Sequence, residues 1–181
     1  PVYLLPGGVT QLRIFEPRYV RMVSESFKHG NGFVICVYID DDNLNVPDWG
    51  ARVEITDFEQ GNDGMLHIQV KSIELVEIGD VSVEADGLRR ANCVAKRHWP
   101  DLPLTDDAVG LSNLLKQIVS NIDVLNRSYQ ETDYQNLSWV CRRWLELIPI
   151  PLEEKLKFSN FNSIGEAKSF LLDILKKDMP N

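Results

Sequence analysis

The hydrophobic period of the sequence changes near Pro103, and this change limits the folds that the chain can adopt. Before Pro103, short apolar runs alternate with polar residues and are separated by glycine-containing turns, as in β-strands. After it, apolar residues recur every three or four positions, as on one face of a helix. The 181 residues therefore predict an α+β fold: a small β pseudo-barrel with one inserted helix over residues 1–103, then a C-terminal α-helical bundle over residues 104–181.

Alternation within the first part predicts its strands and their faces. The run Phe33–Ile39 is apolar on both faces and rich in β-branched residues, which predicts a central strand. In the strand over Ala51–Glu59, alternation places Asp57 on the same face as the apolar residues before it. A long strand over Met65–Ile78 changes phase near Ile73, which predicts a bulge.

The second part predicts four helices. One runs for about 20 residues from Thr105, because its apolar residues keep a helical spacing over that length. Another ends at Pro149, and a short helix over Pro151–Phe158 has proline in its first turn. Ser163 and Glu166 have the spacing of a capping box for the last helix.

The stretch Leu12–Met22 in the first part predicts a strand that turns sharply into a helix. Pro17 fits the first helical position, and Glu16 before it takes the capping position, with its carboxylate against the free N–H groups. Phe15 and Val20 have the spacing of a hydrophobic staple. The helix is predicted to end at Gly30, after two cationic residues.

The same stretch carries a resemblance to a known family. Residues Leu4–Gly8 followed by Leu12–Tyr19 resemble the signature of the N-terminal, substrate-binding domain of the ATP-dependent Lon protease. Further matches follow in the family's order over Val53–Glu59, Gly64–Leu66 and Trp144–Lys155, so the resemblance covers nearly the whole chain. It implies a PUA-like pseudo-barrel and a bacterial, stand-alone copy of the domain that selects protein substrates. In the family a short apolar stretch precedes this point, and the chain begins with proline, so native N-terminal residues are expected to be missing.

The parts of Lon that carry its chemistry are missing from the sequence. Gly-Lys does not occur, so no loop can cradle a triphosphate, and a Ser-Lys peptidase motif is absent too. His29, His67 and His98 have no partner at metal-ligand spacing, and the acidic run Asp40–Asp42 lacks the glycine and glutamate of an EF-hand loop. We therefore expect a non-catalytic protein with no cofactor and no metal.

Composition limits the classes of binding partner that we expect and indicates the cellular compartment. The chain has 19 basic and 27 acidic residues, a net charge of −8, which argues against nucleic acid or an anionic membrane as partner. No apolar run approaches the roughly 18–20 residues that span a bilayer. Cys36, Cys93 and Cys141 are far apart in apolar surroundings, which predicts buried free thiols in a reducing cytoplasm.

The residues where the predicted strand turns into the helix, which we call the corner, allow a structural and a functional interpretation. In the structural one, Arg13, Glu16, Arg18 and Tyr19 hold the corner through an ion pair, a cap and a hydroxyl hydrogen bond. In the functional one, Arg18 and Tyr19 lie with nearby aromatic residues at the mouth of a groove that holds extended, partly apolar polypeptide. The expected partner is unfolded or damaged polypeptide. A stand-alone copy either offers it to a separate ATP-dependent protease or assembles with itself.

An RNA-binding PUA-like module is the alternative. Arg89-Arg90 and Lys96–Trp99 provide positive charge and one ring for stacking on a base. The net charge of −8 argues against it. A small-molecule or hydrolytic enzyme in the barrel cleft is a third interpretation, and no sequence motif supports it.

Overall fold

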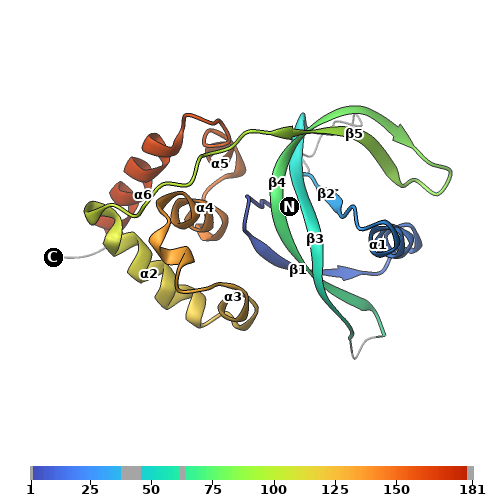
Figure 1. The fold of residues 1–181 in the computed structure, drawn as a ribbon, viewed down its shortest axis with the longest axis horizontal. Coiled ribbons are helices and arrows are strands. Elements are labelled where there is room, and N and C mark those ends of the chain that lie inside the picture. Colours follow the sequence, from blue (N-terminus) through green and yellow to red (C-terminus); the bar gives the residue numbers. More distant parts are fainter. Residues whose placement is uncertain (1, 38–45, 62–63, 179–181) are drawn as a thin grey trace. The chain divides into compact units, whose positions relative to one another are not determined.

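The computed structural model describes residues 2–37, 46–61 and 64–178, and the chain divides into two compact units, Pro1–Lys96 and Arg97–Asn181 (Figure 1). Unit 1 contains an antiparallel sheet and one helix, and unit 2 is helical, so the predicted α+β class is confirmed. The predicted domain boundary after residue 103 stays a prediction. The acidic run Asp40–Asp42 and the end of the predicted strand Phe33–Ile39 lie outside the described residues.

Unit 1 is built on a five-stranded sheet in which β5 pairs with the second half of β4 and the remaining order is β1-β4-β3-β2. All pairs are antiparallel. Among the described strands, β1 and β2 are at opposite edges and do not pair, so the sheet is open and the predicted pseudo-barrel is not confirmed. The predicted inserted helix, α1, is present and connects β1 to β2 at the opposite edge. The prediction of a central strand from Phe33 is wrong among the described strands, because β2 pairs with β3 alone. The strands are β1 (Val9–Ile14), β2 (Phe33–Ile35), β3 (Trp49–Gln60), β4 (Leu66–Val83) and β5 (Arg89–Lys96).

Two bulges interrupt the pairing of β3 with β4. One extra residue on β4, Ile73, lies opposite the step from Arg52 to Val53, which confirms the bulge predicted from the phase change. The other extra residue is Thr56, on β3. A bulge bends its strand and shifts the alternation of every residue that follows.

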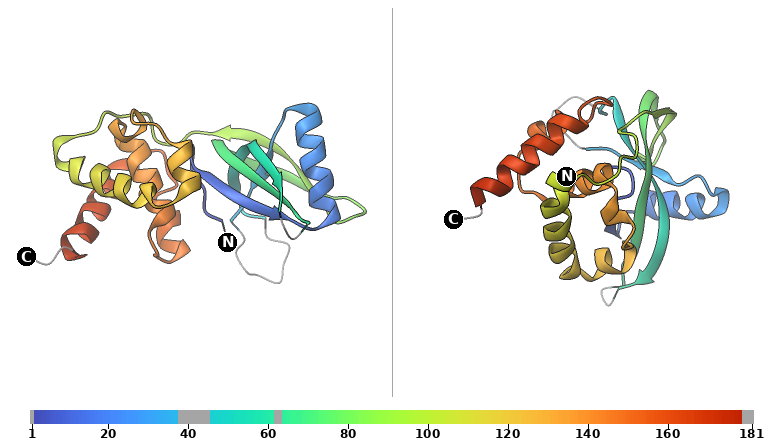
Figure 2. Two further views of the ribbon diagram at one scale, coloured as in Figure 1. Left: turned by 90° about the horizontal axis from the view of Figure 1, so that it is seen from below. Right: turned by 60° about the vertical axis from the view of Figure 1, so that its left-hand side comes forward.

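Helix α1 (Pro17–His29), the blue helix beside the strands in Figure 2, begins and ends as its sequence predicts. Pro17 is its first residue, and Gly30 closes it in the left-handed conformation with φ 68°, where its N–H donates to the carbonyl of Ser26. Val23 and Ser26 are buried, whereas Val20 and Phe27 are exposed. The apolar side chains of the helix therefore divide between the core and the surface.

The helix predicted from Thr105 is interrupted, and unit 2 differs here from the sequence prediction. Helix α2 ends at Ser120, and the hydroxyl of Ser120 and the amide of Asn121 both donate to the carbonyl of Gln117. Such side-chain bonds replace the bond that a continuing helix would make, so a new helix starts at Asp123. The elements are η1 (Asp106–Ala108), α2 (Val109–Ser120), α3 (Asp123–Ser128), η2 (Asp133–Gln135), α4 (Leu137–Leu147), α5 (Leu152–Leu156) and α6 (Ile164–Asp178).

The later helices of unit 2 follow the predicted pattern more closely. Helix α4 ends before Pro149, as predicted, while α5 is shorter than predicted because Pro151 precedes it with extended backbone. The hydroxyl of Ser163, before α6, accepts a hydrogen bond from the Trp99 indole at 3.0 Å. The capping box proposed for Ser163 and Glu166 stays a prediction.

Candidate functional site

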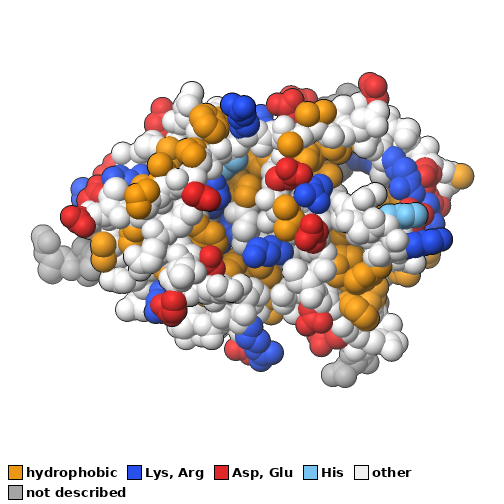
Figure 3. Space-filling model, viewed as in Figure 1, with side chains coloured by type: hydrophobic (Ala, Val, Ile, Leu, Met, Phe, Trp, Pro, Cys, Tyr) orange, Lys and Arg blue, Asp and Glu red, His pale blue; other side chains and the backbone are white. Residues whose placement is uncertain are grey.

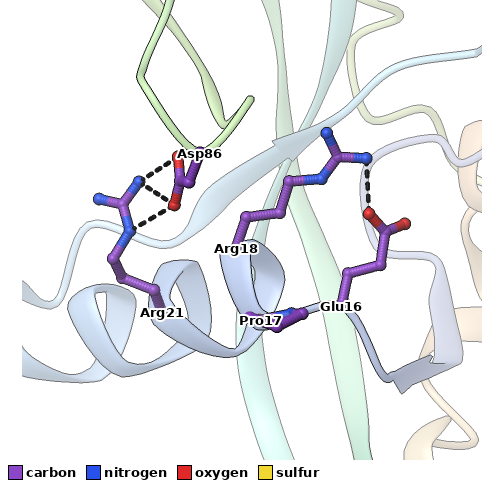
Figure 4. A pocket seen from close by; sticks show the side chains of 5 residues that line it. All are labelled: Glu16, Pro17, Arg18, Arg21 and Asp86. Atoms are coloured by element: carbon purple, nitrogen blue, oxygen red, sulfur yellow. Dashed lines mark hydrogen bonds and ion pairs between the residues drawn. The ribbon is translucent and has the colours of Figure 1, made fainter.

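An ion pair lies at the corner between β1 and α1. The backbone of Glu16 is at the N-cap position of α1, but its carboxylate makes no capping hydrogen bond and pairs with Arg18 Nη2 at 2.6 Å (Figure 4). The predicted capping position is confirmed, but the predicted contact of the carboxylate with the helix N–H groups is wrong, because the carboxylate pairs with the Arg18 guanidinium. Arg18 Nη1 also donates to the carbonyl of Gly87 at 3.3 Å, and its guanidinium carbon lies 4.9 Å from the centre of the Tyr19 ring.

Of the other corner residues, Tyr19 contacts this ion pair through its ring, whereas Arg13 bonds elsewhere. Arg13 Nε, on β1, donates at 3.0 Å to the sulfur of Met65, the residue before β4. Phe15 and Val20 are both exposed, so a staple between them buries little surface. Tyr19 is 37% exposed, and its hydroxyl has no hydrogen-bond partner in the described part of the chain. Of the structural interpretation, the ion pair is present, whereas no hydroxyl bond is found within residues 2–37, 46–61 and 64–178.

Five charged side chains join the next turns of α1 to the hairpin between β4 and β5. Arg21 contacts Glu84, reaches Asp86 at 2.8 Å and reaches Glu25 at 2.9 Å. Arg90 contacts both Glu25 and Glu84. We call these five residues the charged cluster. Bonds from Arg90 and then Arg21 lower the pKa of Glu84, and bonds from the backbone of the hairpin and then from Arg21 lower the pKa of Asp86.

A shallow recess of about 500 Å³ lies between the corner and the charged cluster (Figure 4). The charged side chains at its wall already pair with one another, Glu16 with Arg18 and Asp86 with Arg21. It therefore offers a ligand no unpaired charge from these four groups. In the described residues, no group of three or more histidine, cysteine, aspartate or glutamate side chains could hold a metal ion.

The most exposed ring contact of unit 1 lies on the other flank of α1. The rings of Phe27 and Phe58 meet edge to face, with centroids 5.3 Å apart and planes at 72°, yet they are 51% and 61% exposed. We call them the aromatic pair. Phe58 also lines a second recess of about 410 Å³ with Leu66 from β4. Figure 3 shows hydrophobic side chains gathered beside α1 on this face of unit 1.

Sequence reasoning missed Phe58 because of the bulge at Thr56. Simple alternation from Ile55 places Asp57 on the apolar face and turns Phe58 away from it. In the structure Ile55 lies opposite Val70 and Phe58 lies opposite Ile68, so Ile55 and Phe58 share a face. The prediction that Asp57 lies on the apolar face is therefore wrong. Only the alternation of apolar residues on β4, the partner strand, could have revealed the bulge.

The basic residues of the RNA interpretation are partly neutralised. Arg90 belongs to the charged cluster, and Lys96 Nζ lies 3.8 Å from Glu77. Guanidinium and ammonium groups that already face carboxylates have little to offer a phosphate.

The three cysteines differ in their exposure. All three cysteines are free, but Cys93 is exposed and only Cys141 is buried, so the prediction of buried thiols is wrong for Cys93. Burial raises the pKa of the Cys141 thiol to about 12.

None of the helices in the described ranges has the length and apolar character that crossing a membrane requires.

Comparisons with known proteins identify the family. Residues 1–177 match the ATP-dependent protease La (LON) substrate-binding domain. The structure is similar to a Lon N-terminal domain protein from Xanthomonas campestris, with a TM-score of 0.65, 25% identity and coverage of 99% of this chain and 94% of that one. It shares the fold of the N-terminal domain of Mycobacterium avium complex Lon protease, with a TM-score of 0.61, 15% identity and coverage of 98% and 95%. A search of curated proteins gave no match. The chain therefore belongs to the family of the Lon substrate-binding domain.

Proposed function

We propose that this chain binds segments of unfolded or damaged polypeptide, and that the aromatic pair is the centre of the binding surface. The observation that carries the proposal is the exposure of both rings, 51% and 61%, beside an apolar recess. Burial of apolar surface stabilises a complex by about 25 cal/mol per Å² without fixed geometry. A surface of this kind suits partners that share apolar side chains and no common sequence.

Tyr19 extends this surface along α1 in the proposal. It lies about two turns before Phe27, is 37% exposed, and has the Arg18 guanidinium over its ring. Arg18 then acts mainly as a support, because its own charge is paired with Glu16. Tyr19 provides an aromatic face with a hydroxyl that bonds to none of the described residues, a combination common at binding surfaces.

The proposal is for binding without catalysis, consistent with a family defined by substrate binding. Delivery of the bound polypeptide to a separate ATP-dependent protease and assembly with further copies both remain predictions.

Fluorescence anisotropy of labelled peptides tests the proposal. Peptides from an unfolded protein, and a short single-stranded RNA, are titrated with the protein at low and moderate salt. Phe27→Ala, Phe58→Ala and Tyr19→Ala should each weaken peptide binding about fivefold or more, since about 1 kcal/mol of lost contact corresponds to that factor.

Phe161→Ala is the matched control, because Phe161 is an exposed phenylalanine of unit 2, 44% exposed. It should leave peptide affinity unchanged. Equal affinity of all four variants would contradict the proposed surface. RNA binding that falls steeply with salt, without peptide binding, would favour the alternative function.

A further inference from the structure

One edge of the sheet lies open next to the aromatic pair. Strand β2 covers only Ala51–Val53 of β3, while β4 pairs with the whole other side of that strand. In the described ranges no strand pairs with residues 54–60 of β3 on the β2 side. We call residues 54–60 the open edge. Six of these seven residues are exposed.

The backbone at the open edge is set to receive a strand. The N–H of Gly61 donates to the carbonyl of Met65, so this pair is bonded toward β4. In an antiparallel ladder bonded pairs alternate, which turns the N–H and carbonyl groups of Phe58 and Gln60 away from β4. The structure agrees at Phe58, whose N–H donates to the carboxylate of Asp57 at 2.8 Å. This carboxylate occupies the place that the carbonyl of an added strand would take.

The side chains at the open edge differ between its two faces. Phe58 points to one face, where the ring of Phe27 meets it. Asp57 and Glu59, one residue before and after, are on the other face, and both are exposed. A strand added here would present alternate side chains to an aromatic pair and to two carboxylates.

We propose that the open edge binds an extended segment of non-native polypeptide as an added β-strand, with apolar side chains alternating with basic ones. The inference rests on the proposed function and names its binding mode and substrate class. Backbone pairing supplies affinity that is independent of sequence, and the two faces select the pattern. A second copy of this edge fits poorly, because it would bring Asp57 and Glu59 near the same carboxylates of the first copy.

The test uses labelled nine-residue peptides of alternating leucine and lysine, measured by anisotropy. One peptide is unmodified, and two others carry N-methyl groups on one or the other alternate set of backbone amides. N-methylation removes the donors that face the edge without changing the side chains. We expect one set to lower affinity tenfold or more and the other to change it less than twofold. A peptide with glutamate in place of lysine should bind at least tenfold more weakly than the unmodified one.

Other outcomes separate this inference from the proposed function. Binding that tolerates both methylated sets would overturn strand addition and leave apolar polypeptide binding intact. Failure of the unmodified peptide and of unfolded-protein peptides to bind would overturn the proposed function itself. Equal binding of the lysine and glutamate peptides would remove the charge pattern from the proposal.

A pair of variants tests the protein side. Gln60→Pro removes an outward N–H from an edge strand, where proline is tolerated, while Gln60→Ala removes the same side chain and keeps the N–H. We expect the proline variant to bind the unmodified peptide at least fivefold more weakly and the alanine variant to bind normally. Circular dichroism confirms that the proline variant is folded. If it is not, the methylated peptides still decide the question.

Discussion

The contact between Phe27 and Phe58 should be measurable as a coupling energy in the stability of the protein. Complete burial of a phenylalanine side chain is worth about 1.5–3 kcal/mol, so rings that are 51% and 61% exposed gain roughly half of that, about 0.7–1.5 kcal/mol each. The edge-to-face contact adds about 0.5–1.5 kcal/mol beyond the buried area. Each alanine substitution should therefore lower the free energy of unfolding by about 1–3 kcal/mol.

A double-mutant cycle isolates the contact from the other effects of each substitution. Alanine favours the helix at position 27 by roughly 0.5 kcal/mol and disfavours the strand at position 58, and both effects cancel in the cycle. The loss in the double variant should be smaller than the sum of the single losses by about 0.5–1.5 kcal/mol.

Urea unfolding of the four proteins, followed by circular dichroism, gives the coupling energy as long as the slope against denaturant stays constant. Phe27→Ala combined with Phe161→Ala is the control, and its losses should add. Additive losses for Phe27 and Phe58 would mean that the two rings do not stabilise each other, and the aromatic pair could not then serve as a preformed surface for peptides.

Three further predictions test other parts of the structure. Gly87→Ala should cost about 1–2 kcal/mol of unfolding free energy by urea titration, because Gly87 has φ +82° and a Cβ there would lie 2.8 Å from Arg18 Nη1; Gly64→Ala, with φ +76° and open surroundings, should cost less. Asn136→Ala should cost about 0.5–2 kcal/mol in the same assay, because the Asn136 side chain caps the first turn of α4. The charged cluster should stabilise the fold fully above about pH 4.5 and lose its effect as the pH falls through the lowered carboxyl pKa values. Thermal unfolding scans from about pH 6 to pH 3 should therefore show a smaller fall of the melting temperature in Arg21→Gln than in the unaltered protein.

The features that the sequence predicted correctly depend on local chemistry. Helix α1 begins at Pro17 and ends at Gly30 because proline and glycine fix the backbone angles at those residues. The bulge at Ile73 was visible because β4 is long enough to show apolar residues in both phases. The change from sheet to helices near Pro103 depends only on the spacing of apolar residues.

The features that it predicted wrongly depend on competition between neighbouring groups. The Glu16 carboxylate has both the helix N–H groups and the Arg18 guanidinium within reach, and the sequence does not say which of them prevails. Ser120 and Asn121 are tolerated inside helices, so the sequence does not show that both side chains bond to Gln117. The pseudo-barrel is not confirmed rather than wrong: the described strands form an open sheet, and no local signal in the sequence reports which edge strands pair.

The candidate site was missed because two of its features arise from one residue, Thr56, and a third from the end of β2. As the extra residue of a bulge, it shifts the alternation so that Phe58 shares a face with Ile55 and meets Phe27. The same shift moves Asp57 to the opposite face, where its carboxylate accepts the N–H of Phe58. β2 has already ended beside β3 at this point, so the edge is open where both side chains act. The bulge thus places the aromatic ring and the carboxylate of the proposed site, the end of β2 leaves the edge open, and no single position in the sequence reveals any of them.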